Sequence, residues 1–385
     1  MGGALLGLGL LAAAGWAYLA FFNHGFWRAD QTLPKVAGKV SRWPFVVALV
    51  PARNEEGTIA AALASLANQD YPGSFKIVAV NDNSSDRTAA AARGVKGPIA
   101  VLEAEPLGEG WAGKLAALHQ GATYAAKKLP KAEYIWFTDA DVVHGPKVLR
   151  ALVEAAELDR RALVSQMVML QCENFWERAL VPAFVFFFAM LYPFRAVNDP
   201  RARCAAAAGG SILIVRAVLE EIGGIPSLKG ELIDDCALAK RVKWSGHRTW
   251  LGLGPMSRSI RAYAFADFWA MVTRSAFTEL RHSYALLAAA VFGLGLVFLA
   301  PPALAVIGVL DLDAALLAAG LFSWAAMVVL YAPTLAIYRL NPLWGLALPL
   351  ISALYIAMTV DSGLKHALCR GAVWKGRAYD FTKKR

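Results

Sequence analysis

The chain has 385 residues, of which 57% are hydrophobic and 18% are charged, and its net charge is +10. Its mean hydropathy of +0.45 is too high for an ordinary soluble enzyme. The positive charge does not indicate nucleic-acid binding, because no basic run is interleaved with aromatic residues as a binding face for nucleic acid requires. Much of it lies beside apolar segments, where Lys and Arg mark the cytoplasmic side of a membrane and contact anionic headgroups. The composition therefore predicts a membrane protein.

The charged residues are distributed unevenly along the chain. Residues 1–22 contain none, and residues 284–338 contain only Asp311 and Asp313. The stretch between them is charged as in a globular domain of roughly 240 residues. We predict a membrane anchor at residues 1–24, a catalytic domain at residues 25–282, a membrane region at residues 283–364 and a basic tail at residues 365–385.

The first apolar segment is long enough to span the roughly 30 Å hydrocarbon core of a bilayer. No basic residue precedes it, whereas Arg28, Lys35, Lys39 and Arg42 follow it. This charge pattern predicts an uncleaved anchor with its amino terminus outside, rather than a removed signal peptide. The domain that follows is then expected to face the cytoplasm.

The four cysteines, at positions 172, 204, 236 and 369, show no CxxC spacing and no clustering with histidine. We therefore expect reduced thiols and neither a zinc site nor a disulfide framework.

Short apolar runs alternate with helical stretches between residues 44 and 138. Ser85 is expected to cap the second helix of this series. The alternation predicts a mostly parallel, Rossmann-like α/β sheet, in which ligands bind beyond the carboxyl ends of the strands. The predicted strands are residues 44–51, 76–81, 98–104 and 134–138, and the predicted helices are about residues 56–68, the segment after residues 84–86, and about residues 114–128.

Four later segments are apolar. Residues 176–194 contain about sixteen apolar residues with Pro182 among them, which is short for a span, so we expect a helix lying in the membrane interface and keep a true span as the alternative. Residues 284–310, 314–338 and 342–361 are predicted membrane segments, and Pro301-Pro302 interrupts the first of them. Three full spans would place the basic tail outside, so the number of carboxy-terminal spans, two or three, stays open.

Two aspartates, Asp139 and Asp141, directly follow the apolar run at residues 134–138. Carboxylate oxygens together with substrate phosphates are the ligands that Mg²⁺ or Mn²⁺ prefers. A D-x-D pair at the end of a buried strand therefore predicts a metal-diphosphate site, with an ordinary polar strand end as the alternative.

Polar residues also follow the first two predicted strands. Pro51, Arg53 and Glu55, in PARNEE, are placed to hold the ribose and base of a nucleotide, and Asp82 is placed to accept a hydrogen bond from a uracil-like N–H. Lys114, near the start of a helix, suits a diphosphate, although the spacing of a Walker A loop is missing. The alternative for each is a solvated loop or a residue that favours a helix dipole.

Two further motifs lie after residue 200. Gly209 and Gly210, in AAAAGGSILIV (residues 205–215), form a small-residue turn that leads into a further predicted strand, and they allow the backbone to approach a ligand closely, unless they only form a tight bend. Asp234 and Asp235 open a predicted helix, where one of them is expected to favour the helix N-terminus. The other is a candidate general base for an acceptor hydroxyl.

PARNEE, NDNSSD, TDAD, GGS and IDD, in this order and spacing, resemble a family 2 glycosyltransferase of the GT-A fold. The resemblance covers about residues 44–282, and the ordered set is far more specific than any one motif. The whole chain, with an amino-terminal anchor and hydrophobic segments at its end, looks like the hopanoid-biosynthesis-associated membrane glycosyltransferases. It is more distantly similar to ceramide glucosyltransferases.

The resemblance implies a role for each matching position. Asp82 would contact the base, Asp139 would lie near the ribose and diphosphate, and Asp141 would bind Mn²⁺ or Mg²⁺. Asp235 matches the catalytic aspartate, with Asp234 in place of a glutamate. The implied reaction is inverting transfer from a nucleotide-diphospho sugar, such as a UDP-sugar, to a membrane lipid such as a hopanoid. The implied location is the cytoplasmic face of a bacterial-type inner membrane.

One departure from related synthases is informative. Processive synthases and ceramide enzymes carry a Q/R-x-x-R-W motif before their final membrane segments, whereas TELRH here keeps Arg281 without the Gln or Trp. This argues against a processive polysaccharide synthase. Arg274 and Arg281 are candidate phosphate or acceptor contacts, or ordinary juxtamembrane charges. A nonenzymatic scaffold or lipid carrier would be expected to have lost the carboxylates that are retained here.

Overall fold

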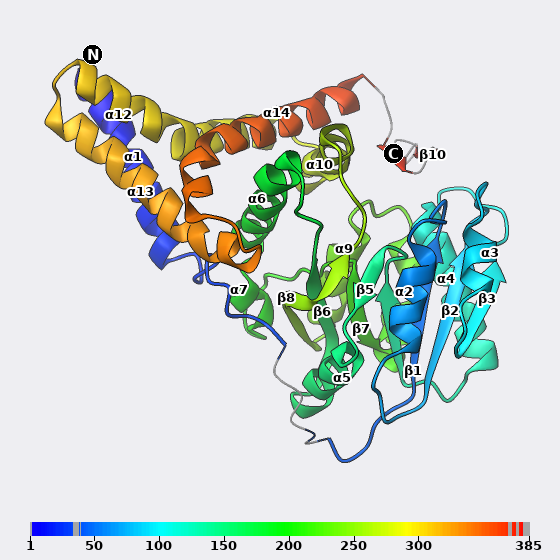
Figure 1. The fold of residues 1–385 in the computed structure, drawn as a ribbon. Coiled ribbons are helices and arrows are strands. Elements are labelled where there is room, and N and C mark those ends of the chain that lie inside the picture. The colour runs from blue at the N-terminus through cyan, green and yellow to red at the C-terminus, as the bar shows by residue number, and fades with distance from the viewer. Residues whose placement is uncertain (1, 34–37, 39, 369–371, 375–376, 380–385) are drawn as a thin grey trace. The chain divides into compact units, whose positions relative to one another are not determined.

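A computed structural model describes residues 2–33, 38, 40–368, 372–374 and 377–379, which form two compact units (Figure 1). The helical unit comprises Met1–Asp30, Cys172–Arg195 and Tyr263–Ala372. The sheet unit comprises Gln31–Gln171, Ala196–Ala262 and Val373–Arg385. The chain therefore passes between the units several times. Residues 172–195 belong to the helical unit because most of their contacts lie within it. The domain boundaries predicted from the chain order stay predictions.

The sheet unit is built on one eight-stranded sheet with the order β3-β2-β1-β4-β7-β6-β8-β5. Strands β1 to β4 pair in parallel, whereas β7 is antiparallel to both β4 and β6. The predicted α/β sheet is confirmed, and β5, β6 and β8 extend it beyond the predicted strands. The strands are β1 (Val46–Ala52), β2 (Phe75–Asn81), β3 (Ile99–Glu103), β4 (Tyr134–Thr138), β5 (Val142–His144), β6 (Arg161–Met169), β7 (Ser211–Val215) and β8 (Arg248–Ser259).

Helices cover both faces of this sheet, which explains why its parallel strands are apolar throughout. Successive side chains of a strand point to opposite faces. Ala48 of β1 accordingly belongs to one core cluster with Leu63 of α2, and Leu49 belongs to the other with Leu115 of α4. The helices of this unit are α2 (Ile59–Ala67), α3 (Thr88–Arg93), α4 (Gly113–Lys128), α5 (Val148–Leu158), α8 (Arg216–Glu221), η1 (Ile225–Leu228) and α9 (Asp234–Trp244).

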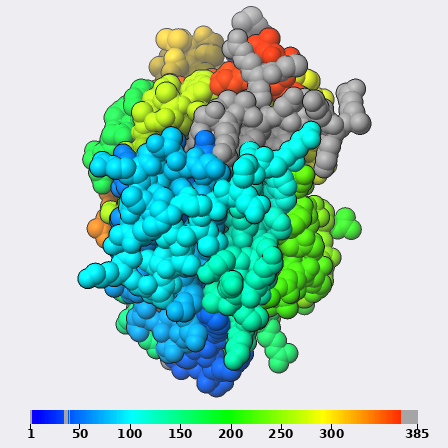
Figure 2. Space-filling model, turned by 90° about the vertical axis from the view of Figure 1, so that its right-hand side faces the viewer, coloured from blue at the N-terminus to red at the C-terminus, as the bar shows by residue number. Residues whose placement is uncertain are grey.

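The amino-terminal part of the sheet unit, coloured blue to cyan, forms much of the face seen in Figure 2. A separate two-stranded ribbon, β9 (Ala372–Trp374) and β10 (Arg377–Tyr379), lies near the end of the chain. Among the described cysteines, Cys172, Cys204 and Cys236 are free thiols, and Cys369 lies outside the described residues.

The helical unit contains four helices that are long and apolar enough to cross a membrane. They are Gly2–Phe21, Tyr284–Leu310, Ala314–Ile337 and Pro342–Ala367. The predicted amino-terminal segment and three carboxy-terminal segments are thus confirmed as helices that fit a membrane protein. The elements of this unit are α1 (Gly2–Phe21), α6 (Phe175–Leu191), α10 (Phe265–Glu279), α11 (Tyr284–Leu294), η2 (Gly295–Leu299), α12 (Ala300–Leu310), α13 (Ala314–Ile337), η3 (Pro342–Ala347) and α14 (Leu348–Ala367), and α7 (Phe194–Asn198) lies where the chain enters the sheet unit.

Pro301 and Pro302 do not end the second of these helices. The helix passes through the five-residue π-helical segment η2 just before the prolines and continues as α12. Because Pro301 has no N–H, it cannot donate to the carbonyl of Val297 four residues earlier. The indole N–H of Trp16 in α1 donates to that carbonyl instead, at 2.8 Å. A neighbouring helix thus satisfies a polar group that would otherwise be unpaired in a membrane segment.

Helix α6 contains Pro182 in its interior and begins with a capping box made by Asn174 and Glu177. The hydroxyl of Tyr355 in α14 donates to the carbonyl of Leu180 at 2.7 Å. The carbonyl that Pro182 leaves without its usual donor is that of Arg178, four residues earlier, so the bond from Tyr355 is a separate link between α14 and α6. The predicted interfacial position of this segment stays a prediction.

Candidate functional site

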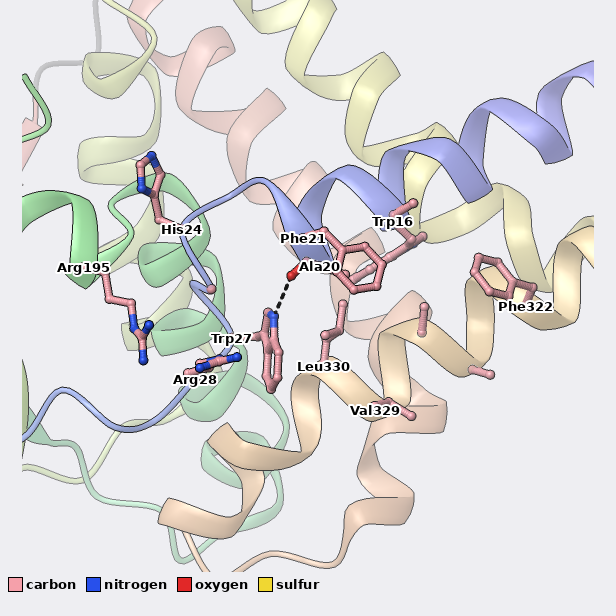
Figure 3. Close-up of a pocket in the computed structure, with 14 residues that line it drawn as sticks. Trp16, Ala20, Phe21, His24, Trp27, Arg28, Arg195, Phe322, Val329 and Leu330 are labelled. Carbon is pink, nitrogen blue, oxygen red and sulfur yellow. Dashed lines mark hydrogen bonds between the residues drawn. The ribbon is translucent and has the colours of Figure 1, made fainter. Parts of the chain in front are cut away.

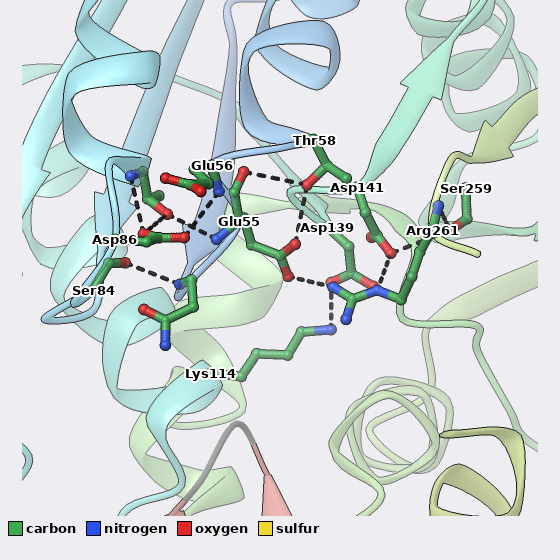
Figure 4. A network of polar contacts seen from close by, with 12 residues as sticks. Glu55, Glu56, Thr58, Ser84, Asp86, Lys114, Asp139, Asp141, Ser259 and Arg261 are labelled. Atoms are coloured by element: carbon green, nitrogen blue, oxygen red, sulfur yellow. Dashed lines mark hydrogen bonds and ion pairs between the residues drawn. The ribbon is translucent and has the colours of Figure 1, made fainter. Parts of the chain in front are cut away.

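Four of the sequence-predicted polar residues lie in one network of polar contacts (Figure 4), namely Glu55, Lys114, Asp139 and Asp141. Strands β1, β2 and β4 are parallel neighbours, so their carboxyl ends lie at the same edge. Strand β7 is antiparallel to β4 and pairs Ser211 with Thr138, which brings its amino end, preceded by Gly209 and Gly210, to that edge as well. The sheet topology therefore assembles loops that are far apart in the sequence.

Lys114, in the first turn of α4, forms an ion pair with Asp139 at the end of β4. Its Nζ atom lies 2.6 Å from Asp139 Oδ1, and the two side chains are 27% and 34% exposed. Burial is the largest single effect and lowers the pKa of Lys114, but the charges of Asp139, Asp234 and Asp235 and the hydrogen bond to Asp139 together outweigh burial and raise it, so the ammonium is retained. Burial and the nearby Asp141 raise the pKa of Asp139 although Lys114 opposes them. Burial thus disfavours the ionised form of Asp139, and the ion pair with Lys114 favours it.

Arg261, which follows β8, links two further carboxylates. Its guanidinium donates to Asp141 Oδ2 at 2.7 Å and also pairs with Glu55. These two carboxylates are only 10% and 11% exposed, whereas the Arg261 side chain is 32% exposed. The hydroxyl of Ser259 adds a hydrogen bond to Asp141 at 3.1 Å. Asp141 and Glu55 are thus held by a cation in this structure.

Sequence reasoning did not identify Arg261 or Ser259. Arg261 lies 120 residues from Asp141 and 206 residues from Glu55, and no spacing rule relates residues so distant. The available signal was a basic residue after an apolar strand, but strand β8 was not among the predicted elements.

Asp235 lies in the first turn of α9 and accepts a hydrogen bond from the backbone N–H of Gly209 at 2.8 Å. A Cβ atom added to Gly209 would lie 3.2 Å from Asp235 Oδ2 and 3.3 Å from Lys114 Nζ. Gly209 therefore lies between the Asp235 carboxylate and the Lys114 ammonium and leaves both groups room. Burial, and then the charge of Asp234, raise the pKa of Asp235 to about 7, against the opposing charge of Lys114.

Arg53 contacts backbone carbonyls rather than open space in this structure. Its guanidinium donates to the carbonyls of Asp82 at 2.7 Å and of Asn83 at 3.1 Å. Asp82 is buried, and its N–H donates to the carbonyl of Ala52 at 2.8 Å. The loops after β1 and β2, predicted to hold a base and ribose, are therefore joined into one surface.

The prediction that Ser85 caps a helix was wrong. Helix α3 begins at Thr88, and the Ser85 N–H and hydroxyl donate to Asn54 Oδ1 at 2.9 and 3.4 Å. Asn54 has a positive φ of 51°, which turns its side chain toward this loop. Ser85 thus connects the loops after β1 and β2.

A divalent metal ion fits this edge only if a substrate completes its coordination. Among the described residues, no three His, Cys, Asp or Glu side chains are grouped to hold a metal ion. A pair of carboxylates such as Asp139 and Asp141 is nevertheless a suitable donor set for Mg²⁺ or Mn²⁺ when phosphate oxygens supply further ligands. Arg274 and Arg281 belong to the helical unit, and their predicted phosphate or acceptor contacts stay predictions.

Part of the chain that contains several residues of this site matches a known protein family. Residues 47–223, which include β1 to β4 and β7, match the family model described as Glycosyl transferase family 2. The match covers Glu55, Asp82, Lys114, Asp139 and Asp141, whereas Asp235 and Arg261 lie after it.

The matches to relatives found by sequence cover only part of each protein. A 4,4'-diaponeurosporenoate glycosyltransferase from Staphylococcus aureus (strain MRSA252) is 32% identical over 131 residues, which are 34% of this chain and 33% of that protein. The protein of the same name from Staphylococcus haemolyticus (strain JCSC1435) is 31% identical over 119 residues, 30% of each chain. This chain thus spans about a third of the length of these curated relatives.

A solved structure shows the same fold. A mannosyltransferase from Pyrobaculum calidifontis, in complex with GDP-Man and Mn²⁺, has a TM-score of 0.56 and 20% identity, and covers 93% of this chain and 98% of that chain.

Proposed function

Because residues 47–223 carry a glycosyltransferase family 2 domain, we propose that this protein transfers a sugar from a nucleotide-diphospho sugar to a membrane lipid. The observation that carries the proposal is the juxtaposition of Asp235 with Lys114, on either side of Gly209. A group suited to remove a proton thus lies beside a group suited to bind a phosphate. This is the arrangement that transfer from a diphosphate leaving group requires.

The donor is assigned to the edge formed by β1, β2 and β4. Asp82 and Arg53 would contact the base and ribose, together with Pro51 and Glu55 in the same loop region. A bound nucleotide would recruit Arg53 from its present backbone partners, Asp82 and Asn83. Gly209 and Gly210 would bring their backbone close to the diphosphate, and Gly210 has no room for a side chain, since a Cβ there would lie 2.8 Å from Val168. A UDP-sugar is the proposed donor.

Lys114 and Arg261 supply the fixed positive charges around the diphosphate. Both pair with carboxylates in this structure, Lys114 with Asp139 and Arg261 with Asp141 and Glu55. Asp139 and Asp141 would hold Mn²⁺ or Mg²⁺ together with diphosphate oxygens, and that ion would offset charge on the leaving group. The Pyrobaculum mannosyltransferase, solved with Mn²⁺, supports the choice of metal.

Asp235 is the proposed general base. One of its carboxylate oxygens would take the proton of the acceptor hydroxyl as the acceptor oxygen bonds to the anomeric carbon. The bond from that carbon to the diphosphate breaks in the same step, so the configuration is inverted without a covalent enzyme intermediate. Asp234 assists indirectly, because its charge helps to raise the pKa of Asp235 to about 7, which suits a base working near neutral pH.

The four apolar helices support an acceptor that lies in the membrane. A hopanoid hydroxyl is the acceptor that the sequence resemblance suggests, whereas the named acceptor of the staphylococcal relatives, diaponeurosporenoate, is a carboxylate. The two differ in chemistry, because a carboxylate is already ionised at neutral pH and needs no general base. The raised pKa of Asp235 favours the hydroxyl. We place the reaction at the cytoplasmic face of a bacterial-type inner membrane, with Arg274 and Arg281 as candidate headgroup contacts.

Calorimetric titration of the detergent-purified protein with UDP, UDP-glucose, UDP-GlcNAc and GDP-mannose, in Mn²⁺ or EDTA, tests the donor assignment. We expect one nucleotide sugar to bind in a metal-dependent manner. Asp141→Asn should remove the metal-dependent part of the affinity, whereas Arg258→Gln, which changes an exposed side chain on the same strand as Ser259, should not. Absence of binding for all four compounds would contradict the proposed donor class.

Transfer itself is tested with Asp235→Asn. We expect this variant to bind the donor as the wild type does and to lose transfer to a hydroxyl acceptor. Parallel assays with a hopanoid alcohol and a long-chain apolar carboxylic acid separate the two acceptor classes, because only the alcohol requires a base. Full transfer to the alcohol by Asp235→Asn would exclude Asp235 as the base.

A further inference from the structure

A groove in the helical unit lies between α1 and α13, and none of the residues assigned to sugar transfer lines it (Figure 3). Its volume is about 810 Å³, which is within the range of pockets that bind small molecules. The groove exists because small side chains line its middle, namely Ala17 and Ala20 of α1 and Ala325 and Ala326 of α13. Val329 extends its apolar wall.

The two helices that form the groove are apolar enough to cross a membrane. Ala325 and Val329 are exposed in this structure, so the middle of the groove opens outward from the helix pair. In a bilayer, this part of the surface would face lipid chains. The shape and chemistry of the groove therefore suit a single hydrocarbon chain lying along the helices.

One end of the groove is basic. His24, Arg28 and Arg195 line this end, which directly follows the last residue of α1, Phe21. Arg195 forms an ion pair with Asp30, whereas the exposed Arg28 stacks its guanidinium over the ring of Trp27, 5.3 Å from the centroid. The charges of Arg195 and Asp30 cancel, so the described residues at this end carry a net charge of about +1, counted with His24 neutral. This net charge comes from Arg28.

Trp27 fixes the geometry of this basic end. Its indole N–H donates to the carbonyl of Ala20 at 3.1 Å, in the last turn of α1. That carbonyl is among those left without a partner at a helix end. Tryptophan is also a common residue at the membrane–water interface. The polar end of the groove thus lies where a membrane span ends and lipid headgroups begin.

We propose that this groove binds one anionic glycerophospholipid, with an acyl chain between α1 and α13 and the phosphate at Arg28. The length of apolar wall followed directly by a basic end matches the order of groups in such a lipid. The net positive charge favours a headgroup with net negative charge over a zwitterionic one, whose ammonium would be repelled. The proposal is independent of the sugar donor and acceptor, because it requires neither for binding.

Native mass spectrometry of the full-length protein in detergent, titrated with dioleoylphosphatidylglycerol or dioleoylphosphatidylcholine, tests the proposal. We expect one phosphatidylglycerol to bind about fivefold more tightly than phosphatidylcholine, from the contribution of one basic side chain at a membrane surface. Arg28→Gln should remove this preference. Arg339→Gln is the matched control, since Arg339 is an exposed arginine just after α13 that does not line the groove.

The acyl part of the site is tested by Ala325→Phe, which fills the groove from an exposed position, against Ala289→Phe, on an exposed position of α11. Only Ala325→Phe should weaken binding of both lipids. Glycerol 3-phosphate, which has no acyl chain, should not displace the lipid. Equal binding of the two lipids to the wild type, equal effects of Arg28→Gln and Arg339→Gln, equal effects of the two phenylalanine variants, or displacement by glycerol 3-phosphate would each overturn the proposal.

Discussion

Replacing Arg261 with glutamine would remove the cation that Asp141 and Glu55 share. Both carboxylates are about nine-tenths buried, at 10% and 11% side-chain exposure, so water would replace the guanidinium poorly. Asp141 would keep only its hydrogen bond from Ser259, and Glu55 would keep its hydrogen bond from Thr58. We expect the variant to be less stable than the wild type when no metal ion is bound.

The size of the effect follows from the burial of the three side chains. Removing one partner of a buried ion pair costs roughly 3–5 kcal/mol. The Arg261 side chain is 32% exposed, and both carboxylates keep a hydroxyl partner, which reduces our expectation to about 2 kcal/mol. For a unit of about 200 residues, this free energy lowers the melting temperature by roughly 4–8 °C.

Thermal unfolding of the detergent-purified protein, at a fixed scan rate in EDTA and in Mn²⁺ and with UDP present in both to supply phosphate oxygens, measures this change as an apparent midpoint. Arg258→Gln is the control, because it removes the same charge from an exposed side chain three residues earlier. In Mn²⁺ the difference between Arg261→Gln and the control should shrink. A metal ion at Asp141 would replace the missing positive charge and stabilise the folded state by binding to it.

The reasoning fails if Arg261→Gln and Arg258→Gln have the same apparent melting midpoint in EDTA. The folded state would then not need the Arg261 guanidinium to offset the charges of the two carboxylates. It also fails if Mn²⁺ raises the midpoints of both variants equally. That result would show that the metal ion does not take over the role of Arg261 at Asp141.

Four further predictions follow from the same edge of the sheet and from the helical unit. Because burial and Asp234 raise the pKa of Asp235 to about 7, kcat/KM for a hydroxyl acceptor should rise as the pH rises through 7; a flat profile from about pH 5.5 to 8.5 would contradict this. The raised pKa also means that ionising Asp235 costs stability as the pH rises from its unfolded value of about 4 toward 7, so Asp235→Asn should melt above the wild type at pH 8 but not at pH 4. Gly209→Ala would displace Lys114 and Asp235 and should lower kcat by roughly 100-fold with little change in melting temperature, whereas Gly57→Ala, with no neighbour within 4 Å, should leave kcat unchanged. Trp16→Phe would leave the Val297 carbonyl without its donor and should lower the stability of the helical unit by about 1 kcal/mol, seen as a lower apparent midpoint; an unchanged midpoint would show that the bond contributes nothing.

Much of the fold was predictable because its signals are local. The apolar run at residues 46–50 and the helix at Gly113–Lys128 follow from periodicity and flanking residues over about ten positions. The four membrane-length helices follow from composition alone, because charged residues are costly in hydrocarbon. Strands β6 and β8 were not predicted, although both lie inside the sheet.

The candidate site was only partly predictable for a related reason. Asp139 and Asp141 were identifiable because both lie at the end of one apolar strand. The role of Gly209 as the residue between Lys114 and Asp235 was not identifiable, since it depends on β7 running antiparallel to β4. Arg261 was missed entirely, because its carboxylate partners come from the ends of two other strands.

The sequence by itself determined that this chain combines an α/β sheet with apolar helices, and which carboxylates follow its strands. Those features depend on neighbouring residues and on the alternation of apolar and polar positions. Only the tertiary structure decided which charges are paired and that Trp16 completes the hydrogen bonding near Pro301. Such contacts join residues more than a hundred positions apart in several cases, so their energies depend on distance in space and on burial, which are properties of the folded chain.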